Sequence, residues 1–340
     1  MKRVVVRRPG GHSALELLEE RDPAVGAGQV RVRVRAAGIN YADCIVRMGR
    51  YEAAKGRYPL TPGFEFAGEV DGVSVGSGFK NGDRVLGITR FGGYASSIVA
   101  DSGMVWRSPE GWSHEQSAAF PAVTLTAWYA LHRSARILPG ETLLVHSAAG
   151  GVGTALVQLG KAAKCRVVAV VGNPSKAGLP KDLGADAVVV RDGEGFWKAV
   201  DEAAPTGFDA VFDANGLSTL RPGFDRLSPG GRLVVYGFAD LLTRGRDKAN
   251  ILGLALRYAR LPRFNPFELT RLNRGVSGFN VVYLFNRPDL AAQAMGEVLA
   301  LVEKGKLKPP PVTPFPVEKV AEAHRALESG DTMGKLVLTF

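Results

Sequence analysis

A short apolar strand that runs directly into a glycine-rich turn is the feature that most constrains this chain. Residues 143–145 (Leu-Leu-Val) form the strand, and residues 148–153 follow with the pattern Ala-x-Gly-x-x-Gly. Residues 154–163 then have a helical pattern, and residues 166–171 are a second apolar strand. A strand, glycine turn, helix and second strand in this order predict a parallel βαβ unit.

The turn has the chemistry of a dinucleotide-binding site. Gly150 lets the backbone approach a pyrophosphate, and Gly153 lets the helix pack closely against the strand. The start of the helix offers free N–H groups and a partial positive charge to phosphates. A turn that serves only packing is the alternative, but the flanking pattern favours cofactor binding. The expected contacts from the turn are Ala149, Gly150, Gly151, Val152 and Gly153.

The composition is that of a globular protein of about two domains. The chain has 340 residues, of which 46% are hydrophobic and 22% are charged. No apolar run approaches the ~20 residues that cross a bilayer, and the N-terminus is too short and too charged for a signal peptide. Cys44 and Cys165 stand alone, which is typical of a reducing compartment. We therefore expect a cytoplasmic protein.

The net charge of +10 is concentrated in one segment. Eight basic and only two acidic residues lie between Arg244 and Arg274. One hypothesis is a basic amphipathic helix that contacts a membrane surface or an acidic partner. The alternative is a lid or domain-interface helix with solvated arginines. Nucleic-acid binding is not expected, because no RNA-recognition aromatic motif is present.

Strand and helix patterns change along the chain. Residues 1–105 are dense in glycine and proline, and Val30, Val32 and Val34 alternate with arginines as in a half-buried strand. Five strands that alternate with helices are predicted at residues 142–146, 166–171, 187–190, 210–213 and 232–236. Further predictions are helices over 113–119, 124–134 and 288–305, a sixth strand over 277–284, a linker over 308–316 and a final strand over 335–340.

These patterns predict an α/β protein with two domains. The first is β-rich and discontinuous, at residues 1–122 and 308–340. The second, at residues 123–307, is a doubly wound parallel-sheet (Rossmann) domain that carries the basic insertion at about 240–274.

Six motifs, spread over nearly the whole chain, carry a family resemblance. They are residues 37–43 (AGINYAD), 62–68 (PGFEFAG), 81–85 (NGDRV), 148–153 (AAGGVG), 183–186 (LGAD) and 334–338 (GKLVL). In this order they resemble the medium-chain dehydrogenase/reductase superfamily, in its zinc-free quinone oxidoreductase branch. Residues 276–280, with the insertion before them, look more like the subgroup of vesicle amine transport protein homologues. The resemblance implies a GroES-like catalytic first domain, a Rossmann domain and a homodimer.

The resemblance also predicts that the chain holds no zinc. Zinc-dependent members carry a catalytic Cys and a His at places that here match Asn40 and Phe64. Neither side chain is a normal zinc ligand. The four-cysteine structural loop of those members is also missing. Without a Lewis acid, hydride transfer to an electron-poor acceptor, such as a quinone or an α,β-unsaturated carbonyl, is favoured over alcohol oxidation.

The nicotinamide cofactor is expected to be NADPH. NAD-type sites place an acid about 20 residues beyond the glycine turn, but the chain has Asn173, Ser175 and Lys176 there and no acid before Asp182. Ser175 and Lys176 could bind a 2′-phosphate, and the resemblance adds Arg191. The alternative is that Lys176 and Arg191 are simply solvated. Further contacts implied by the resemblance or by strand ends are Thr126, Asn215, Tyr236, Gly237, Phe238, Phe279 and Asn280.

The acceptor side has three candidate catalytic residues. Asn40 could hydrogen-bond a substrate oxygen, and Tyr41 and Tyr51 flank its segment. Tyr51 matches a tyrosine near the active site of related quinone oxidoreductases and could donate a proton. A packing role for each of them is the alternative. The sequence thus predicts an NADPH-dependent, zinc-independent reductase of a quinone or enone. Its alternative is a weakly catalytic NADPH-binding protein that acts through its basic insertion.

Overall fold

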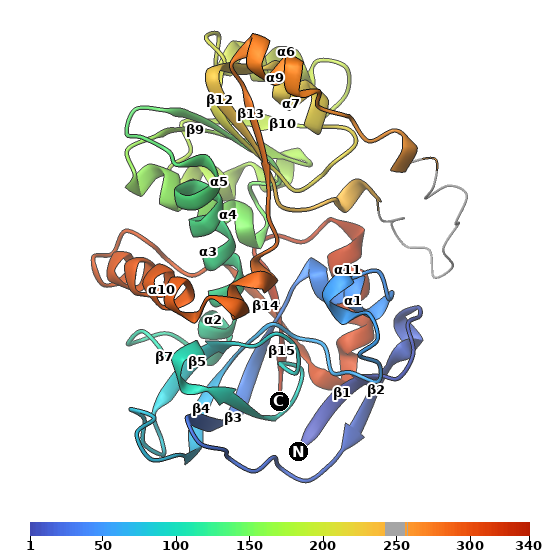
Figure 1. Cartoon of the computed structure of the whole chain (residues 1–340), viewed down its shortest axis with the longest axis vertical. Helices are drawn as coiled ribbons and strands as arrows, with labels where there is room; N and C mark the ends of the chain where they lie inside the picture. Colours follow the sequence, from blue (N-terminus) through green and yellow to red (C-terminus); the bar gives the residue numbers. More distant parts are fainter. Residues whose placement is uncertain (242–255, 257) are drawn as a thin grey trace. The chain divides into compact units, whose positions relative to one another are not determined.

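The chain divides into two compact units. The computed structural model describes residues 1–241, 256 and 258–340. One unit comprises Met1–Leu125 and Val282–Phe340, and the other comprises Thr126–Val281 (Figure 1). The centre of the basic insertion, residues 242–255 and 257, lies outside the described residues.

The first unit is built on a seven-stranded sheet in the order β14-β15-β3-β4-β5-β7, with β6 paired to β3. Its strands are β3 (Gln29–Ile39), β4 (Glu65–Val73), β5 (Arg84–Ile88), β6 (Ser97–Asp101), β7 (Val105–Arg107), β14 (Val312–Pro316) and β15 (Lys335–Thr339). A separate antiparallel pair joins β1 (Lys2–Val6) to β2 (Leu15–Glu19). The helices are α1 (Tyr41–Arg47), α2 (His114–Ala118), α10 (Pro288–Glu303) and α11 (Val320–Ser329).

The alternation in the longest strand, β3, is confirmed. Val30, Val32 and Val34 are buried in a cluster with Phe66. The intervening arginines bond to acids on β4 (Arg31 Nε to Asp71 Oδ1, 2.8 Å; Arg35 Nη2 to Glu69 Oε2, 3.0 Å). The strand therefore separates a buried apolar face from a charged face, as a period of two requires.

The second unit is a six-stranded parallel sheet in the order β10-β9-β8-β11-β12-β13. Its strands are β8 (Thr142–Val145), β9 (Arg166–Val171), β10 (Ala187–Val190), β11 (Phe208–Asp213), β12 (Leu227–Val235) and β13 (Gly275–Gly278). Its helices are α4 (Gly151–Ala162), α5 (Gly178–Asp182), α6 (Phe196–Ala203), α7 (Leu220–Asp225) and α9 (Pro266–Leu272), and α3 (Pro121–Trp128) leads into it. The strand order starts in the middle and winds outward both ways, which is the doubly wound arrangement.

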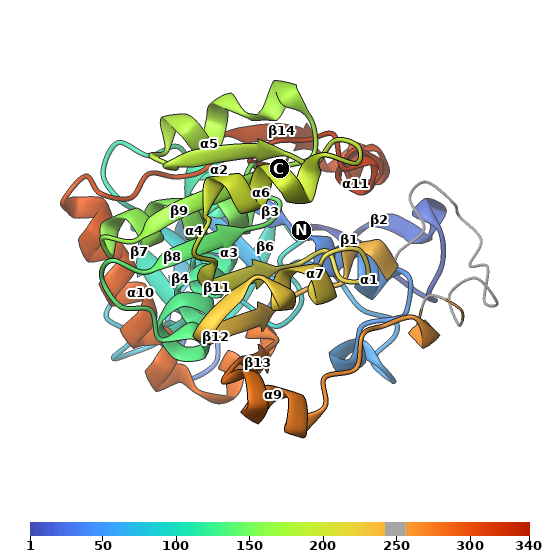
Figure 2. The same cartoon turned by 90° about the horizontal axis from the view of Figure 1, so that it is seen from above.

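Helices cover both faces of this sheet (Figure 2). Helices α6, α7 and α9 share one apolar cluster with the strands, including Phe196, Phe224 and Leu269. Helices α4 and α5 contact each other, and α4 packs on β8 and β9. Right-handed crossovers in opposite directions place these two groups on opposite faces.

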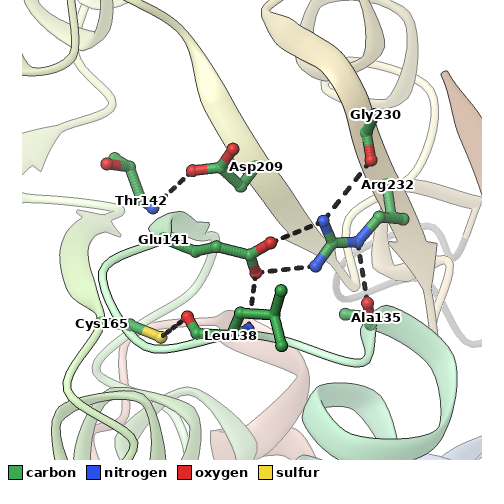
Figure 3. A network of polar contacts seen from close by, with 8 residues as sticks. All are labelled: Ala135, Leu138, Glu141, Thr142, Cys165, Asp209, Gly230 and Arg232. Atoms are coloured by element: carbon green, nitrogen blue, oxygen red, sulfur yellow. Dashed lines mark hydrogen bonds and ion pairs between the residues drawn. The ribbon is translucent and has the colours of Figure 1, made fainter. Parts of the chain in front are cut away.

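A network of polar contacts ties the amino ends of three strands together (Figure 3). Arg232 of β12 forms a two-pronged ion pair with Glu141 (Nη1–Oε1, 2.9 Å; Nη2–Oε2, 2.7 Å), and its Nε donates to the carbonyl of Ala135. The N–H of Thr142, at the start of β8, donates to Asp209 Oδ2 of β11 over 2.8 Å. This end of the sheet is therefore fixed by satisfied, partly buried charges.

Several predicted boundaries were wrong. The sixth strand is only Gly275–Gly278, which pairs with β12, and a 3-10 helix (Val281–Asn286) replaces the rest. The apolar run that suggested a strand instead buries Val282 and Leu284 from this helix. The predicted linker contains β14, which pairs in parallel with β15 despite its prolines. An edge strand tolerates proline, because one side needs no hydrogen bonds.

Two helices also differ from prediction. The helix expected over 124–134 starts earlier, at Pro121, and ends in a π-helical stretch, Tyr129–Ala135. The helix after the glycine turn begins at Gly151 rather than Thr154, because its first turn is formed by the glycine motif itself.

Residues 282–307, expected in the nucleotide domain, pack with the first unit, where α10 contacts the Ser102–Met104 turn.

Candidate active site

The glycine turn after β8 is shaped for close approach of a ligand. Gly150 caps α4, and a Cβ on Gly153 would lie 2.3 Å from the carbonyl oxygen of Ser147. Any side chain on Gly153 would therefore push α4 away from the turn. The first N–H groups of the helix, on Gly151, Val152 and Gly153, have no carbonyl one turn earlier to bond. The turn thus presents backbone donors at the positive end of a 12-residue helix.

Cationic side chains flank the carboxyl end of β9. The N–H of Arg191 donates to the carbonyl of Val171 over 2.8 Å, which places Arg191 beside the loop that holds Asn173, Ser175 and Lys176. Lys176 is buried, and the Ser175 hydroxyl donates to Asn173 Oδ1 over 2.6 Å. Within the described residues, Nη1 of Arg191 is buried without a hydrogen-bond partner. A buried guanidinium nitrogen in that state is costly, so this loop fits an incoming anion.

The carboxyl ends of β11 and β12 hold the next predicted contacts. Asp213 Oδ1 accepts the N–H groups of Asn215 (2.7 Å) and Gly216 (3.0 Å) and so shapes the turn after β11. Asn215 Oδ1 accepts from the Ser147 hydroxyl over 2.9 Å, which joins this turn to the glycine turn. The N–H of Tyr236 donates to the Asp213 carbonyl over 3.0 Å.

Aromatic rings gather beside these strand ends. Phe279 lies between Tyr129 (ring centroids 4.7 Å apart) and Tyr236 (6.3 Å). Burial, and then the charge of Asp213, raises the pKa of Tyr236, so its hydroxyl stays protonated. Of the other expected contacts, Thr126 is buried in the entry helix, while Phe238 and Asn280 are exposed. A Cβ on Gly237 would meet the Ala214 carbonyl oxygen at 3.1 Å.

In the first unit, aromatic side chains surround the position where zinc-dependent relatives carry a histidine. Phe64 is buried with its ring centroid 5.6 Å from Tyr51 and 5.6 Å from Phe91. Ala42 and Phe285 pack against the same cluster. Tyr41 begins α1 and is half-buried. Phe64 therefore places an aromatic ring at this position, and its side chain has no metal-binding atom.

Asn40 lies at the end of β3 and is engaged by two charged side chains. Its Oδ1 accepts from the Lys335 ammonium, and its Nδ2 donates to Glu65 Oε1 over 2.9 Å. Lys335 and Glu65 form a buried ion pair, with 2.8 Å between Nζ and Oε1. With its oxygen on an ammonium and its nitrogen on a carboxylate, Asn40 is a poor metal ligand.

Within the described part of the chain, one group of side chains has the spacing of metal ligands. Cys44, His324 and Glu328 are buried, with ligand atoms within 4.8 Å of one another. However, Glu328 Oε1 lies 2.9 Å from the Arg47 guanidinium, and Oε2 lies 3.0 Å from His12 Nε2. His324 bridges Cys44 (3.4 Å) and the Tyr94 hydroxyl (3.2 Å). Because Arg47 already neutralises Glu328, a second cation there would be repelled, and we interpret the group as a hydrogen-bonded network.

Burial sets the protonation of this network. It lowers the pKa of His324 to about 3, with Arg47 as a further cause, and raises the pKa of the Cys44 thiol well above its usual range. His324 is therefore neutral and Cys44 is an unreactive thiol at neutral pH. Cys44 is thus a buried residue that also contacts His324.

The described part of the basic segment is attached to the second unit by one face. Glu268 of α9 pairs with Arg221 (Oε1–Nη2, 2.6 Å), and the Arg274 guanidinium lies over the Phe224 ring. Phe267, on the same helix, is 74% exposed. Among the described residues, no helix has the length and apolar character needed to cross a membrane.

Taken together, a GroES-like β unit and a doubly wound parallel sheet with a glycine turn define an oxidoreductase of the dehydrogenase type. The family model for the alcohol dehydrogenase GroES-like domain matches residues 26–110, and the model for zinc-binding dehydrogenases matches residues 183–338. The human synaptic vesicle membrane protein VAT-1 homolog is 33% identical over 97% of this chain and 84% of its own.

Two solved structures share the fold over essentially their whole length. The quinone oxidoreductase from Thermus thermophilus, solved also in complex with NADPH, is 33% identical with a TM-score of 0.80 and covers 100% of both chains. The CurK enoyl reductase is 26% identical with a TM-score of 0.83, covering 99% of this chain and 98% of its own. This chain belongs to the medium-chain dehydrogenase/reductase superfamily, in the branch that contains quinone oxidoreductases and VAT-1 homologues.

Sequence reasoning did not single out four residues that contact the predicted ones within their own units: Tyr129 beside Phe279, Phe91 beside Phe64, and Glu65 and Lys335 on Asn40. Tyr129 lies in the helix predicted over 124–134, but that prediction did not say which side chains lie on which face of the helix. Phe91 lies in a loop, where no periodic pattern marks it. Glu65 and Lys335 were quoted only as letters of the motifs at 62–68 and 334–338. A buried lysine and glutamate in otherwise apolar motifs were the available signal, because such charges are rarely buried unless they are paired.

Proposed function

We propose that this protein is an NADPH-dependent, zinc-independent reductase of quinones or α,β-unsaturated carbonyl compounds. The observation that carries the proposal is the environment of Phe64. An aromatic cluster with Tyr51 and Phe91 occupies the place of a zinc ligand, and the other expected ligand position holds the Asn40 amide. This chemistry suits a flat, electron-poor acceptor rather than an alcohol.

The second unit supports NADPH as the cofactor. The turn from Ala149 to Gly153 would hold the pyrophosphate, and Asn173, Ser175, Lys176 and Arg191 would hold the adenosine 2′-phosphate. Nη1 of Arg191, which has no hydrogen-bond partner among the described residues, fits a phosphate better than two ribose hydroxyls, and so does the absence of an acid between residues 172 and 181. Thr126, Asn215, Tyr236, Gly237, Phe238, Phe279 and Asn280 would surround the ribose and nicotinamide.

The bound cofactor would supply a hydride to the electron-poor carbon of the acceptor and leave as NADP⁺. The chain must then hold the oxygen on which negative charge develops, and a proton must follow to give the hydroquinone or saturated ketone. Asn40 is proposed to bind that oxygen. Tyr51 or solvent is proposed to deliver the proton.

The direct test is oxidation of NADPH by purified protein with a panel of quinones and enones. We expect turnover with at least one acceptor, tighter binding of NADPH than of NADH, and full activity after dialysis against a chelator. Tight NADPH binding with no turnover on any acceptor would refute the reductase. Tyr51→Phe should lower turnover if Tyr51 donates the proton, and unchanged turnover would assign the proton to solvent.

A second candidate function is a peripheral contact with an anionic membrane. It is favoured by the 74% exposure of Phe267 in a segment whose Arg263 and Arg271 are also exposed, and by the vesicle membrane that the VAT-1 relatives are named for. Flotation with vesicles that contain phosphatidylserine should recover the protein at low salt and lose it at high salt. Phe267→Ser should weaken recovery, whereas binding to neutral vesicles alone would contradict the electrostatic contact.

We also propose a homodimer, which light scattering would test.

A further inference from the structure

Asn40 is held from both ends of its side chain by buried charges. Lys335 and Glu65 are 4% and 0% exposed, and they form an ion pair of 2.8 Å. The amide oxygen of Asn40 faces the Lys335 ammonium, and the amide nitrogen faces Glu65 Oε1. A flipped amide would place N–H groups against an ammonium and an oxygen against a carboxylate. The ion pair therefore fixes the orientation of the amide.

The supports of Asn40 are themselves fixed. Glu65 Oε2 accepts the N–H of Ala122, at the start of α3, over 2.8 Å. A Cβ on Gly38 would lie 2.3 Å from Glu65 Oε1, so the glycine leaves the space that the carboxylate fills. Asp43 accepts the backbone N–H of Asn40 (2.8 Å) with one oxygen and that of Gly63 (2.8 Å) with the other.

This arrangement leaves one donor available. An asparagine side chain carries two N–H groups, and among the described residues the contact with Glu65 accounts for one of them. Asn40 is half-buried, whereas its two charged partners are inaccessible. The ammonium on Oδ1 polarises the amide and makes the remaining N–H a stronger donor.

We propose that Lys335 and Glu65 are positioning residues, which orient and polarise Asn40 so that its second N–H binds the carbonyl oxygen of the acceptor. The inference rests on the proposed function and deepens it. It restricts the acceptor to compounds that have a carbonyl oxygen conjugated to the reduced carbon. The opposing interpretation is a purely structural ion pair that ties β15 to β4.

The test compares three variants with an exposed control: Asn40→Ala, the double variant Glu65→Gln/Lys335→Met, and the triple variant that combines them. Asn40→Ala removes the donor, and the double variant Glu65→Gln/Lys335→Met removes the charges without leaving one of them unpaired. Lys306→Met, at an exposed lysine of the same unit, controls for lost charge. The kinetic constants are measured with duroquinone (which has no free ring position for thiol addition), and the Kd of NADPH is measured by fluorescence.

We expect kcat/KM to fall about 10- to 100-fold in Asn40→Ala and in the double variant, as for loss of a hydrogen bond to developing charge. The Kd of NADPH should stay within about twofold. The triple variant should be no worse than Asn40→Ala, because the charges act only through Asn40. A double variant within twofold of the wild type, or losses that multiply in the triple variant, would leave only the structural ion pair.

A second readout keeps the inference testable if folding or turnover fails. If the double variant does not fold, Lys335→Arg keeps the charge and moves the donor, and it should lower kcat/KM at an unchanged melting temperature. Equal kcat/KM would then overturn the inference. If the wild type reduces no acceptor, the proposed function fails. In that case the inference is tested by the side-chain ¹⁵N–H signals of Asn40 in the wild type. These signals should shift when duroquinone is added without cofactor, and no shift would refute the inference.

Discussion

In the parallel sheet of the second unit, the polar groups beside the amino ends of β8, β11 and β12 are satisfied, whereas several at the carboxyl ends of the strands are not. At the amino ends, Arg232 and Glu141 satisfy each other, and Asp209 accepts from the backbone of β8. At the carboxyl ends, polar atoms of His146, Arg191 and Asp213 are buried with no hydrogen-bond partner among the described residues. Both ends come from the same strands, so strand formation cannot explain the difference.

The difference indicates that the two ends of the sheet have different roles, one in stability and the other in ligand binding. Satisfied charges at the amino ends stabilise the sheet whether or not a ligand is present. The polar atoms at the carboxyl ends that lack a protein partner among the described residues are groups that a polar ligand or ordered water would satisfy. Open α/β sheets bind ligands outside the carboxyl ends of their strands. Changes at one end should therefore alter stability, and changes at the other should alter binding.

The largest effect is expected at the amino ends. Glu141→Ala leaves the partly buried Arg232 without its carboxylate, and it should lower the free energy of unfolding by about 3 kcal/mol. The Kd of NADPH at 25 °C should stay within about twofold. Denaturant unfolding and fluorescence titration measure the two quantities. Glu202→Ala, which breaks an exposed pair with Lys198, is the control and should leave stability unchanged. A large rise in the Kd of NADPH for Glu141→Ala would contradict the claim that the amino ends act on stability and not on binding.

At the carboxyl ends, Gly153→Ala should act mainly on binding. The added Cβ would meet the Ser147 carbonyl oxygen at 2.3 Å and displace the start of α4. A lost hydrogen bond from the turn to a charged phosphate costs about 1.5–3 kcal/mol, so we expect the Kd of NADPH to rise about 10- to 100-fold. Gly178→Ala is the matched control, because no atom lies within 4 Å of its Cβ. Equal Kd values for the two variants would contradict the role of the turn.

A smaller effect should separate the two nicotinamide cofactors. Arg191→Gln removes the guanidinium that flanks the end of β9, and it should weaken NADPH about 10-fold, the usual size for a hydrogen bond to a charged group. Binding of NADH should not change. Lys198→Gln, at an exposed lysine of the same unit, should affect neither cofactor. A parallel loss of NADH affinity would assign Arg191 to the sheet rather than to the 2′-phosphate.

The smallest effect is a pH dependence from His146. Burial lowers the pKa of His146 below its ordinary value near 6.5, while Asp213 and Asp240 act to raise it and Arg191 to lower it. The folded state therefore resists a proton that the unfolded state accepts. The stability from this group is present above pH 6.5 and falls below it, by at most about 1.4 kcal/mol per pH unit.

Urea unfolding of the free protein at pH 7.5 and 5.5 measures this dependence. Between these two pH values the free energy of unfolding should fall less in His146→Leu than in the wild type. The difference should correspond to the uptake of about one proton. His324 and His114, whose pKa values are also lowered, should add to the loss. Asp43 should oppose it, because burial raises its pKa to about 7 and the folded state therefore takes up a proton in this range that the unfolded state does not. An identical pH dependence in wild type and His146→Leu would mean that His146 is protonated in the folded state.

Much of the second unit could be predicted from the sequence because its signals are local. Buried parallel strands give continuous apolar runs such as residues 166–171, and the glycine turn is a steric requirement visible in six residues. The strand order β10-β9-β8-β11-β12-β13 then follows from few permitted topologies. The edge strand β13 was predicted over residues 277–284 rather than at Gly275–Gly278, because a four-residue strand carries little pattern.

The acceptor side could be predicted only in part. Asn40, Tyr51 and Phe64 stood out by their motif positions, but their surroundings come from distant segments. Lys335 lies 295 positions after Asn40, and the contact between them depends on the pairing of β15 with β3. A pattern in one stretch of chain holds no information about such a pairing, because many registers bury the same apolar residues.

The sequence by itself determined the two kinds of fold unit, the glycine turn and the residue types, Asn40 and Phe64, at the positions that the family resemblance matches to zinc ligands. These features depend on periodicity, steric limits and side-chain chemistry, which act over a few residues. Only the tertiary structure decided which polar groups are satisfied. It paired Arg232 with Glu141 and Lys335 with Glu65, and it left Arg191 and His146 with unpartnered polar atoms among the described residues. Satisfaction of a buried charge depends on what the fold brings within about 3 Å of it, and that distance is set by the packing of the whole unit.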